Sequence, residues 1–119
     1  MMKITAENIK ELIKYGEHST LEMKKCKKSV PDSVWETYSA FANTRGGIIL
    51  LGVYENKEKP LAERFEVTGV MDSNKVVTDF FNQLHNPQKV NRSVLVDSDV
   101  RIVEVDGKDV IYINVPEAD

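Results

Sequence analysis

The chain has 119 residues and a net charge of −3 at pH 7, with 41% hydrophobic and 29% charged residues. These values are typical of one globular domain and exclude a strongly basic protein that coats DNA. No stretch approaches the roughly 20 apolar residues of a membrane span, and the polar N-terminal segment lacks the apolar centre of a secretory signal. We therefore expect a cytoplasmic protein that does not enter a membrane.

The charges are unevenly distributed along the chain. Residues 1–59 contain ten Lys or Arg and eight Asp or Glu, whereas residues 60–119 contain six and eleven. An asymmetry of this kind can give an acidic protein one basic face. An unevenly solvated surface would produce the same counts.

Hydrophobic periodicity predicts a helix and a strand at the start of the chain. Ile9, Leu12 and Ile13 recur at helical spacing, which indicates a helix over about residues 5–15. Leu21 and Met23 alternate with polar residues, which is typical of a strand over residues 20–24. A loop that ends near residue 31 follows this strand.

The second predicted helix begins at Asp32 or Ser33, and Ser33 with Glu36 fits a capping box. Its apolar stripe consists of Val34, Trp35, Tyr38, Phe41 and Ala42. Gly46 and Gly47 end the helix region. The apolar run from Ile48 to Val53 then predicts a central strand covered on both faces, with helices on at least one side.

The second half predicts smaller elements, a third helix and a hairpin. Residues 55–59 form a charged loop, and residues 64–70 contain a short strand. A helix capped by Asp72, Ser73 or Asn74 carries an apolar stripe of Val76, Val77, Phe80, Phe81 and Leu84. Residues 88–93 read as a loop and residues 94–96 as a strand fragment. Asp106-Gly107 between two β-branched runs predicts a hairpin over residues 100–115.

Together these elements predict a single α+β domain over residues 1–119, close to the α/β class. It would contain a mixed central β-sheet packed by about three helices and would end in a β-hairpin. The glycines do not form a P-loop or a dinucleotide-binding fingerprint. Tyr54 is the aromatic residue placed at the end of the central strand, near where a site would open.

A run of lysines after the first strand is the best candidate for contact with phosphate. Lys24, Lys25, Lys27 and Lys28 would bind backbone phosphate as point charges, with strong salt dependence and little sequence preference. Arg45, at the turn before the glycines, could add a two-pronged contact. Cys26 lies among these lysines, and the positive charges would lower its pKa. Solvated lysines without a ligand are the alternative reading.

Two carboxylates near the first strand suggest a different chemistry. Glu17 and Glu22 could hold a divalent cation, which prefers oxygen ligands and could activate water for phosphate hydrolysis. Glu22-Met23-Lys24 also has the Glu-x-Lys form found on strands of some metal-dependent nucleases. An exposed strand face with a Glu–Lys pair is the alternative reading.

The same segments resemble a known family, the Schlafen-type AlbA domain. The resemblance is carried by Glu17, by Glu22-Met23-Lys24, by the helix residues Ser39 to Thr44 and by the run Gly46 to Val53. It covers nearly the whole chain, and its most specific part is Ala40-Phe41-Ala42-Asn43-Thr44 followed by Gly46-Gly47. The family is described as a DNA-binding module of bacterial transcriptional regulators and RecG-related helicases, usually as the N-terminal part of a longer protein.

The resemblance also implies a second activity. Some animal Schlafen relatives cleave transfer RNA with three acidic residues and a divalent metal. Two of those acids match Glu17 and Glu22, whereas the third falls where this chain has Tyr54 and Glu55.

Three hypotheses follow for the function. The first is a nucleic-acid-binding module, with DNA preferred over RNA, which needs no cofactor and uses Lys24, Lys25, Lys27, Lys28 and Arg45. The second is a Schlafen-type endoribonuclease with Mg²⁺ or Mn²⁺, in which Glu17 and Glu22 bind the metal and Glu55 completes the catalytic set. The third is a regulatory assembly domain that forms a homodimer through an unpaired edge strand, since the chain stops directly after a strand.

Overall fold

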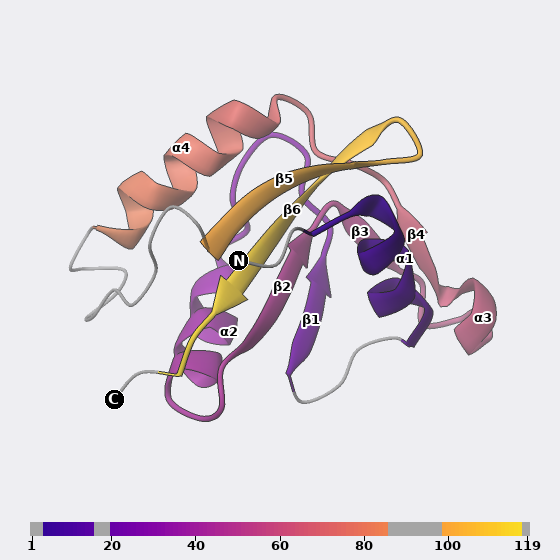
Figure 1. Ribbon diagram of the computed structural model, residues 1–119, viewed down its shortest axis with the longest axis horizontal. Coiled ribbons are helices and arrows are strands. Elements are labelled where there is room, and N and C mark those ends of the chain that lie inside the picture. The colour runs from indigo at the N-terminus through magenta and orange to yellow at the C-terminus, as the bar shows by residue number, and fades with distance from the viewer. Residues whose placement is uncertain (1–3, 16–19, 86–98, 118–119) are drawn as a thin grey trace.

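A four-stranded mixed sheet organises the fold, with strand order β1-β2-β6-β5 (Figure 1). The computed structural model describes residues 4–15, 20–85 and 99–117. The strands of this sheet are β1 (Leu21–Lys24), β2 (Gly47–Leu51), β5 (Val100–Val105) and β6 (Lys108–Val115). β1 pairs parallel with β2, and the other neighbours pair antiparallel. The expected α+β class with a mixed sheet is confirmed.

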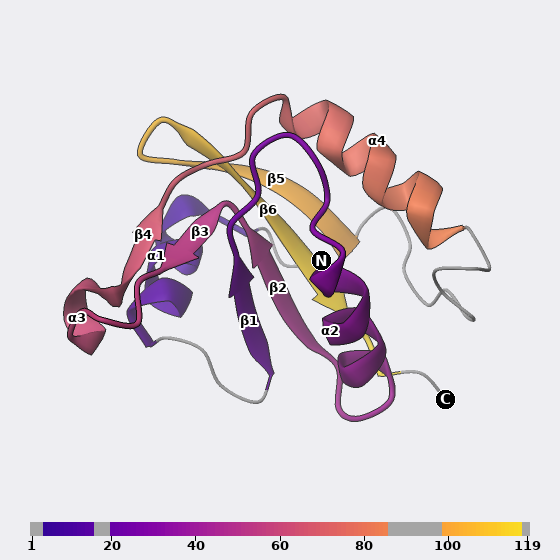
Figure 2. The same cartoon turned by 180° about the vertical axis from the view of Figure 1, so that it is seen from behind.

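Helices cover both faces of the sheet. α2 (Ser33–Ala42) and α4 (Ser73–Leu84) lie on one face, and α1 (Ala6–Tyr15) lies on the other (Figures 1 and 2). A single-turn helix, α3 (Leu61–Arg64), connects β3 (Val53–Glu55) and β4 (Phe65–Val67). None of the helices in the described ranges has the length and apolar character needed to cross a membrane.

Each face of the sheet buries its own hydrophobic core. On one side Ile49 and Leu51 pack with the apolar stripes of α2 and α4. Trp35 joins these two helices, because its ring stacks on Phe80 at 5.0 Å between centroids and its Nε1 donates to Gln83 Oε1 at 3.0 Å. On the other side Leu50 packs against α1 and against β3 and β4, which form a separate two-stranded sheet. The predicted stripes of both helices are confirmed, and so is the prediction that both faces of the central strand are covered.

The central strand is shorter than predicted, because Gly52 interrupts it. Gly52 has φ of +102°, its amide donates to the Lys24 carbonyl, and its carbonyl accepts from the amides of Thr68 and Gly69. The chain therefore leaves the large sheet here. Val53 belongs to β3 (Val53–Glu55), which pairs with β4 (Phe65–Val67) in a separate two-stranded sheet. Glu55, predicted to open an exposed loop, is the last residue of β3.

The C-terminal hairpin forms as predicted around Asp106-Gly107. Both residues have positive φ, +52° and +78°, which is the backbone of a two-residue turn matched to strand twist. The expectation that the last strand forms an unpaired edge is wrong, however. β6 lies between β2 and β5, so β1 and β5 are the outer two of the strands that the structure describes in the large sheet.

The predicted caps of α2 and α4 differ in outcome. Asp32 occupies the N-cap of α2 and Ser33 is its first helical residue, so Ser33 does not take the position that a capping box requires. Asp72 caps α4 as predicted, since its side chain accepts a hydrogen bond from the amide of Lys75. The predicted loop at residues 88–93 and the strand fragment at 94–96 lie outside the described residues.

Candidate nucleic-acid interface

The lysine run forms a loop between β1 and α2, which we call the basic loop (residues 25–31). Cys26 and Val30 anchor it, since both side chains are buried in the core beneath α2 and α4. The amide of Met71 donates to the Lys27 carbonyl at 2.8 Å and ties the loop to the segment before α4. Lys25, Lys27 and Lys28 are exposed. The buried residues therefore fix the loop while three ammonium groups face solvent.

Lys24 differs from the other lysines because it has a partner on its own strand. Its Nζ lies 3.7 Å from Glu22 Oε1, and its side chain is only 15% exposed. Both side chains lie on the α2 side of β1, since Leu21 and Met23, which alternate with them along the strand, pack toward α1. Glu22 offsets the charge of Lys24, so Lys24 is a weaker candidate for phosphate contact than the three exposed lysines.

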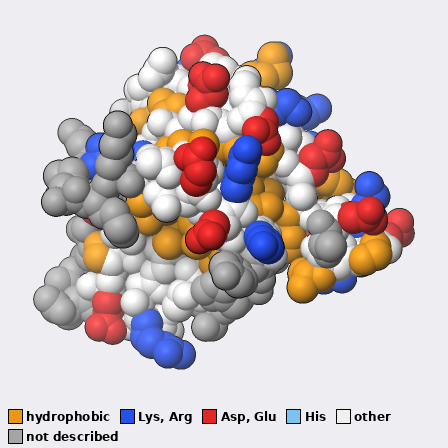
Figure 3. Space-filling model, turned by 45° about the vertical axis from the view of Figure 1, so that its right-hand side comes forward, with side chains coloured by type: hydrophobic (Ala, Val, Ile, Leu, Met, Phe, Trp, Pro, Cys, Tyr) orange, Lys and Arg blue, Asp and Glu red, His pale blue; other side chains and the backbone are white. Residues whose placement is uncertain are grey.

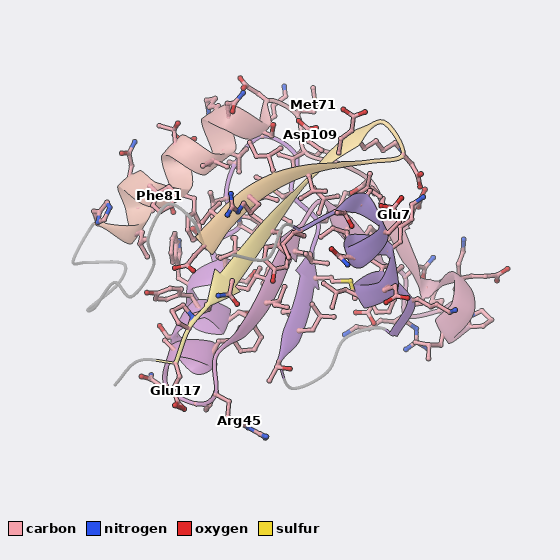
Figure 4. All side chains as sticks on the ribbon, viewed as in Figure 1. Glu7, Arg45, Met71, Phe81, Asp109 and Glu117 are labelled. Atoms are coloured by element: carbon pink, nitrogen blue, oxygen red, sulfur yellow. The ribbon has the colours of Figure 1, made fainter. Side chains whose placement is uncertain are left out.

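Arg45 lies at the opposite end of the sheet from the basic loop. It precedes β2, and Figure 4 shows it beside the chain end that carries Glu117. The basic loop follows the end of β1, which is level with the end of β2. The five residues of β2 separate the two by roughly 16 Å at about 3.3 Å per residue. The structure therefore does not bring Arg45 together with the lysines.

The three predicted catalytic acids are only partly placed. Glu17 lies outside the described residues. Glu22 sits on β1 next to Lys24, and Glu55 ends β3. Within the described part of the chain, no three His, Cys, Asp or Glu side chains gather closely enough to hold a metal ion. The described residues do not form a metal centre by themselves.

The thiol of Cys26 behaves differently from the sequence prediction. Its Sγ donates to the Ser29 carbonyl oxygen at 3.2 Å, and the side chain is 3% exposed. Burial disfavours the thiolate and raises the pKa of Cys26 to about 11. The neighbouring lysines face solvent, which screens their charges. The predicted lowering of this pKa is therefore wrong, and a nucleophilic thiol is not supported.

An exposed aromatic ring lies next to the basic loop. Tyr54 on β3 is 40% exposed, while Val53 before it is fully buried. Lys25 Nζ lies 5.3 Å from the centroid of the Tyr54 ring, within the range of a cation–π contact. The signal in the sequence was the alternation along this short strand, which places Tyr54 on the face opposite Val53.

A separate groove lies on the α1 side of the molecule. Lys10, Ile13 and Phe65 line it, with Lys14 and Leu61 at one end and Asp106 and Lys108 at the other. Figure 3 shows hydrophobic side chains in this region surrounded by both charge signs. Lys10 pairs with Asp106 at 2.8 Å, and Lys108 donates to the Val67 carbonyl oxygen at 3.3 Å. Lys10 and Lys108 thus both have partners within the protein.

Comparison with known proteins gives two matches. The family model described as Schlafen, AlbA_2 matches residues 17–119. A solved structure, the N-terminal domain of a Nitrosomonas europaea protein described as related to the ATP-dependent DNA helicase RecG, superimposes with a TM-score of 0.72. It is 27% identical, and the alignment covers 98% of this chain and 76% of that one. No curated protein matches the chain.

Proposed function

The chain belongs to the Schlafen AlbA_2 domain family, and from this premise we propose that it binds nucleic acid, DNA in preference to RNA. The observation that supports this proposal is the basic loop. Three exposed lysines, Lys25, Lys27 and Lys28, stand on a loop held by two buried side chains. The description of the Nitrosomonas europaea protein as related to a DNA helicase favours DNA as the ligand.

The physical basis of binding is electrostatic. Lysine ammonium groups neutralise backbone phosphates and release condensed counterions, so affinity falls as salt rises. Such contacts position the nucleic acid but carry no sequence information. A loop with a fixed path also loses less conformational entropy on binding than an unanchored run of lysines would. The proposed module therefore binds weakly, with little sequence preference and no turnover.

A titration against labelled DNA and RNA of the same sequence, at several salt concentrations, tests this function. The charge-reversed variant Lys25→Glu/Lys27→Glu/Lys28→Glu should lose most of its affinity at low salt. Its slope of log affinity against log salt should be smaller by roughly two to three, since each phosphate contact contributes about 0.7 to 0.9.

A matched control has the same change in net charge at other exposed lysines. Lys14→Glu/Lys57→Glu/Lys59→Glu replaces three side chains that lie on α1 and on the turn after β3. It should bind more strongly than the basic-loop variant. Equal affinity of the wild type and the basic-loop variant would overturn the proposal.

The assembly hypothesis makes a different prediction for the same samples. A domain that mainly mediates assembly would form a concentration-dependent dimer and leave the oligonucleotide unbound. Sedimentation velocity of the wild type, with and without the labelled DNA, separates the two functions. We expect the sedimentation of the DNA to change in the presence of the protein, whatever the oligomeric state of the protein alone.

A further inference from the structure

We infer that Tyr54 and Lys25 form a stacking site for an unpaired base and its phosphate, so that the domain prefers single-stranded nucleic acid to a duplex. This inference rests on the proposed function and adds the class of ligand, namely single-stranded nucleic acid. Neither the lysine run nor the family match specifies whether the ligand is paired. The geometry around Tyr54 bears directly on that question.

The ring of Tyr54 is exposed, unlike the aromatic rings of α2. Tyr38, the tyrosine of α2, is buried in the core, and Trp35 is only 7% exposed. Tyr54 is 40% exposed because Val53 takes the buried position of β3 and strand residues alternate. Its ring is thus a flat apolar surface in contact with water. Stacking a base on such a ring removes apolar area of both partners from water.

A positive charge lies next to this ring. Lys25 Nζ lies 5.3 Å from the ring centroid, so one aromatic ring and one ammonium group stand side by side. A nucleotide presents the complementary pair, a flat base and a phosphate. The flexible stem of lysine lets Nζ move from the ring to a phosphate oxygen without a change in the backbone. Glu66 lies opposite Tyr54 on β4, so the phosphate is expected on the Lys25 side and not on the Glu66 side.

Tyr54 and the basic loop lie at the same end of the large sheet. β3 leaves the large sheet at Gly52 and runs beside the β1 edge, at the end of the sheet where the basic loop begins (Figures 1 and 2). Lys27 and Lys28 extend from the same loop and can contact the phosphates of following nucleotides. A base held inside a duplex stack cannot lie flat on a protein ring, whereas an unpaired base can. The site therefore selects single strands.

The test compares Tyr54→Ala, Tyr54→Phe and the wild type on one labelled single strand and on the corresponding duplex. Tyr54→Ala should weaken single-strand binding by about tenfold, within the roughly 5- to 150-fold expected for one stacked base, and change duplex binding less than about twofold. Tyr54→Phe should keep the affinity, because the ring remains. Leu61→Ala, an exposed apolar residue on α3, serves as the control for loss of apolar surface.

The salt dependence separates stacking from charge. Tyr54→Ala should lower affinity by the same factor at every salt concentration, with an unchanged slope, whereas the basic-loop variant changes the slope. If the wild type binds and Tyr54→Ala binds a single strand equally well, the stacking site is wrong and the proposed function stands. If the wild type binds neither ligand at low salt, both fail. Circular dichroism of each variant confirms that it is folded.

Discussion

The hydroxyl of Ser73 donates a 2.6 Å hydrogen bond to Oδ2 of Asp109, which joins the first turn of α4 to the start of β6. Ser73 is only 5% exposed, and the backbone carbonyl of Asp109 also accepts from the amide of Val70 at 2.8 Å. This one strand residue therefore holds both the entry to α4 and its first turn. Figure 4 shows Asp109 close to Met71, whose amide donates to the Lys27 carbonyl of the basic loop.

Asp109→Ala should destabilise the domain by about 1–3 kcal/mol, because the buried Ser73 hydroxyl loses its partner. Ser73→Ala should cost less, since the half-buried carboxylate of Asp109 can still reach water. Chemical denaturation of both variants and the double variant measures the coupling. Lys75→Ala is the control on the same helix, because its exposed pair with Asp79 contributes only about 0.5 kcal/mol. Equal stability of Asp109→Ala and the wild type would contradict this role.

Two glycines with the same φ predict very different costs of substitution. Gly46 and Gly107 both have φ of +78°. A Cβ at Gly46 would lie 2.5 Å from the Val115 carbonyl oxygen, whereas a Cβ at Gly107 would meet no atom within 4 Å. Gly107→Ala should therefore cost only the strain of the left-handed backbone, about 1–2 kcal/mol. Gly46→Ala should cost clearly more, because the turn must also move away from the end of β6.

Thermal unfolding of the two variants provides the comparison, with each serving as the control of the other. The amide of Gly46 also donates to the Phe41 carbonyl at 2.7 Å, so displacement of the turn would strain the end of α2 as well. A melting temperature that falls equally in both variants would show that the turn relaxes freely.

The sequence predicts the amphipathic helices and the hairpin because one local signal decides each of them. The stripe of α2 and the Asp106-Gly107 turn need no knowledge of the rest of the chain. The interruption at Gly52 is different. Ile48 to Val53 is uniformly apolar because both sheets bury their residues, so periodicity cannot show where the chain passes from one sheet to the other. Gly52 itself was the available signal, since a glycine inside a strand often marks a local break.

The placement of the candidate site depends on topology that local patterns do not contain. Arg45 and the lysine run lie within about 20 residues of each other in sequence, yet the helical crossover between parallel β1 and β2 puts them at opposite ends of the sheet. The same crossover brings Tyr54 to the end where the basic loop begins. α3 was missed for another reason, because a helix of four residues is too short for any periodicity to be visible.

The buried thiol of Cys26 predicts a fall in stability at high pH. Burial raises the pKa of Cys26 to about 11 in the folded protein, from about 9 for an exposed thiol. Between these two values the folded state holds a proton that the unfolded state has lost, so the free energy of unfolding decreases as pH rises from about 9 to 11. Cys26→Ala should show a smaller decrease over this range than the wild type.

Alkylation of Cys26 gives an independent measurement of the same property. Iodoacetamide at pH 8 should react slowly with the folded protein and rapidly with the protein in denaturant, because the thiolate is the nucleophile. In the stability measurement, Tyr112, whose pKa is raised by burial and by nearby Asp99, contributes to the wild type and to Cys26→Ala alike, so the difference between the two proteins reports Cys26. Rapid alkylation of the folded protein would contradict a buried, protonated thiol.

Incubation with RNA and Mn²⁺ distinguishes binding from cleavage, and we expect the RNA to remain intact. Tyr54 occupies the position where the family resemblance expects the third acid, and within the described residues no three His, Cys, Asp or Glu side chains gather closely enough to hold a metal ion. The nuclease hypothesis predicts the opposite, namely cleavage that depends on Mn²⁺ and is lost in Glu22→Gln. Glu58→Gln, at an exposed residue of the turn after β3, is the control. Cleavage by the wild type and Glu58→Gln but not by Glu22→Gln would make the domain an enzyme. Cleavage that persists in Glu22→Gln would exclude the Glu22 site as its source.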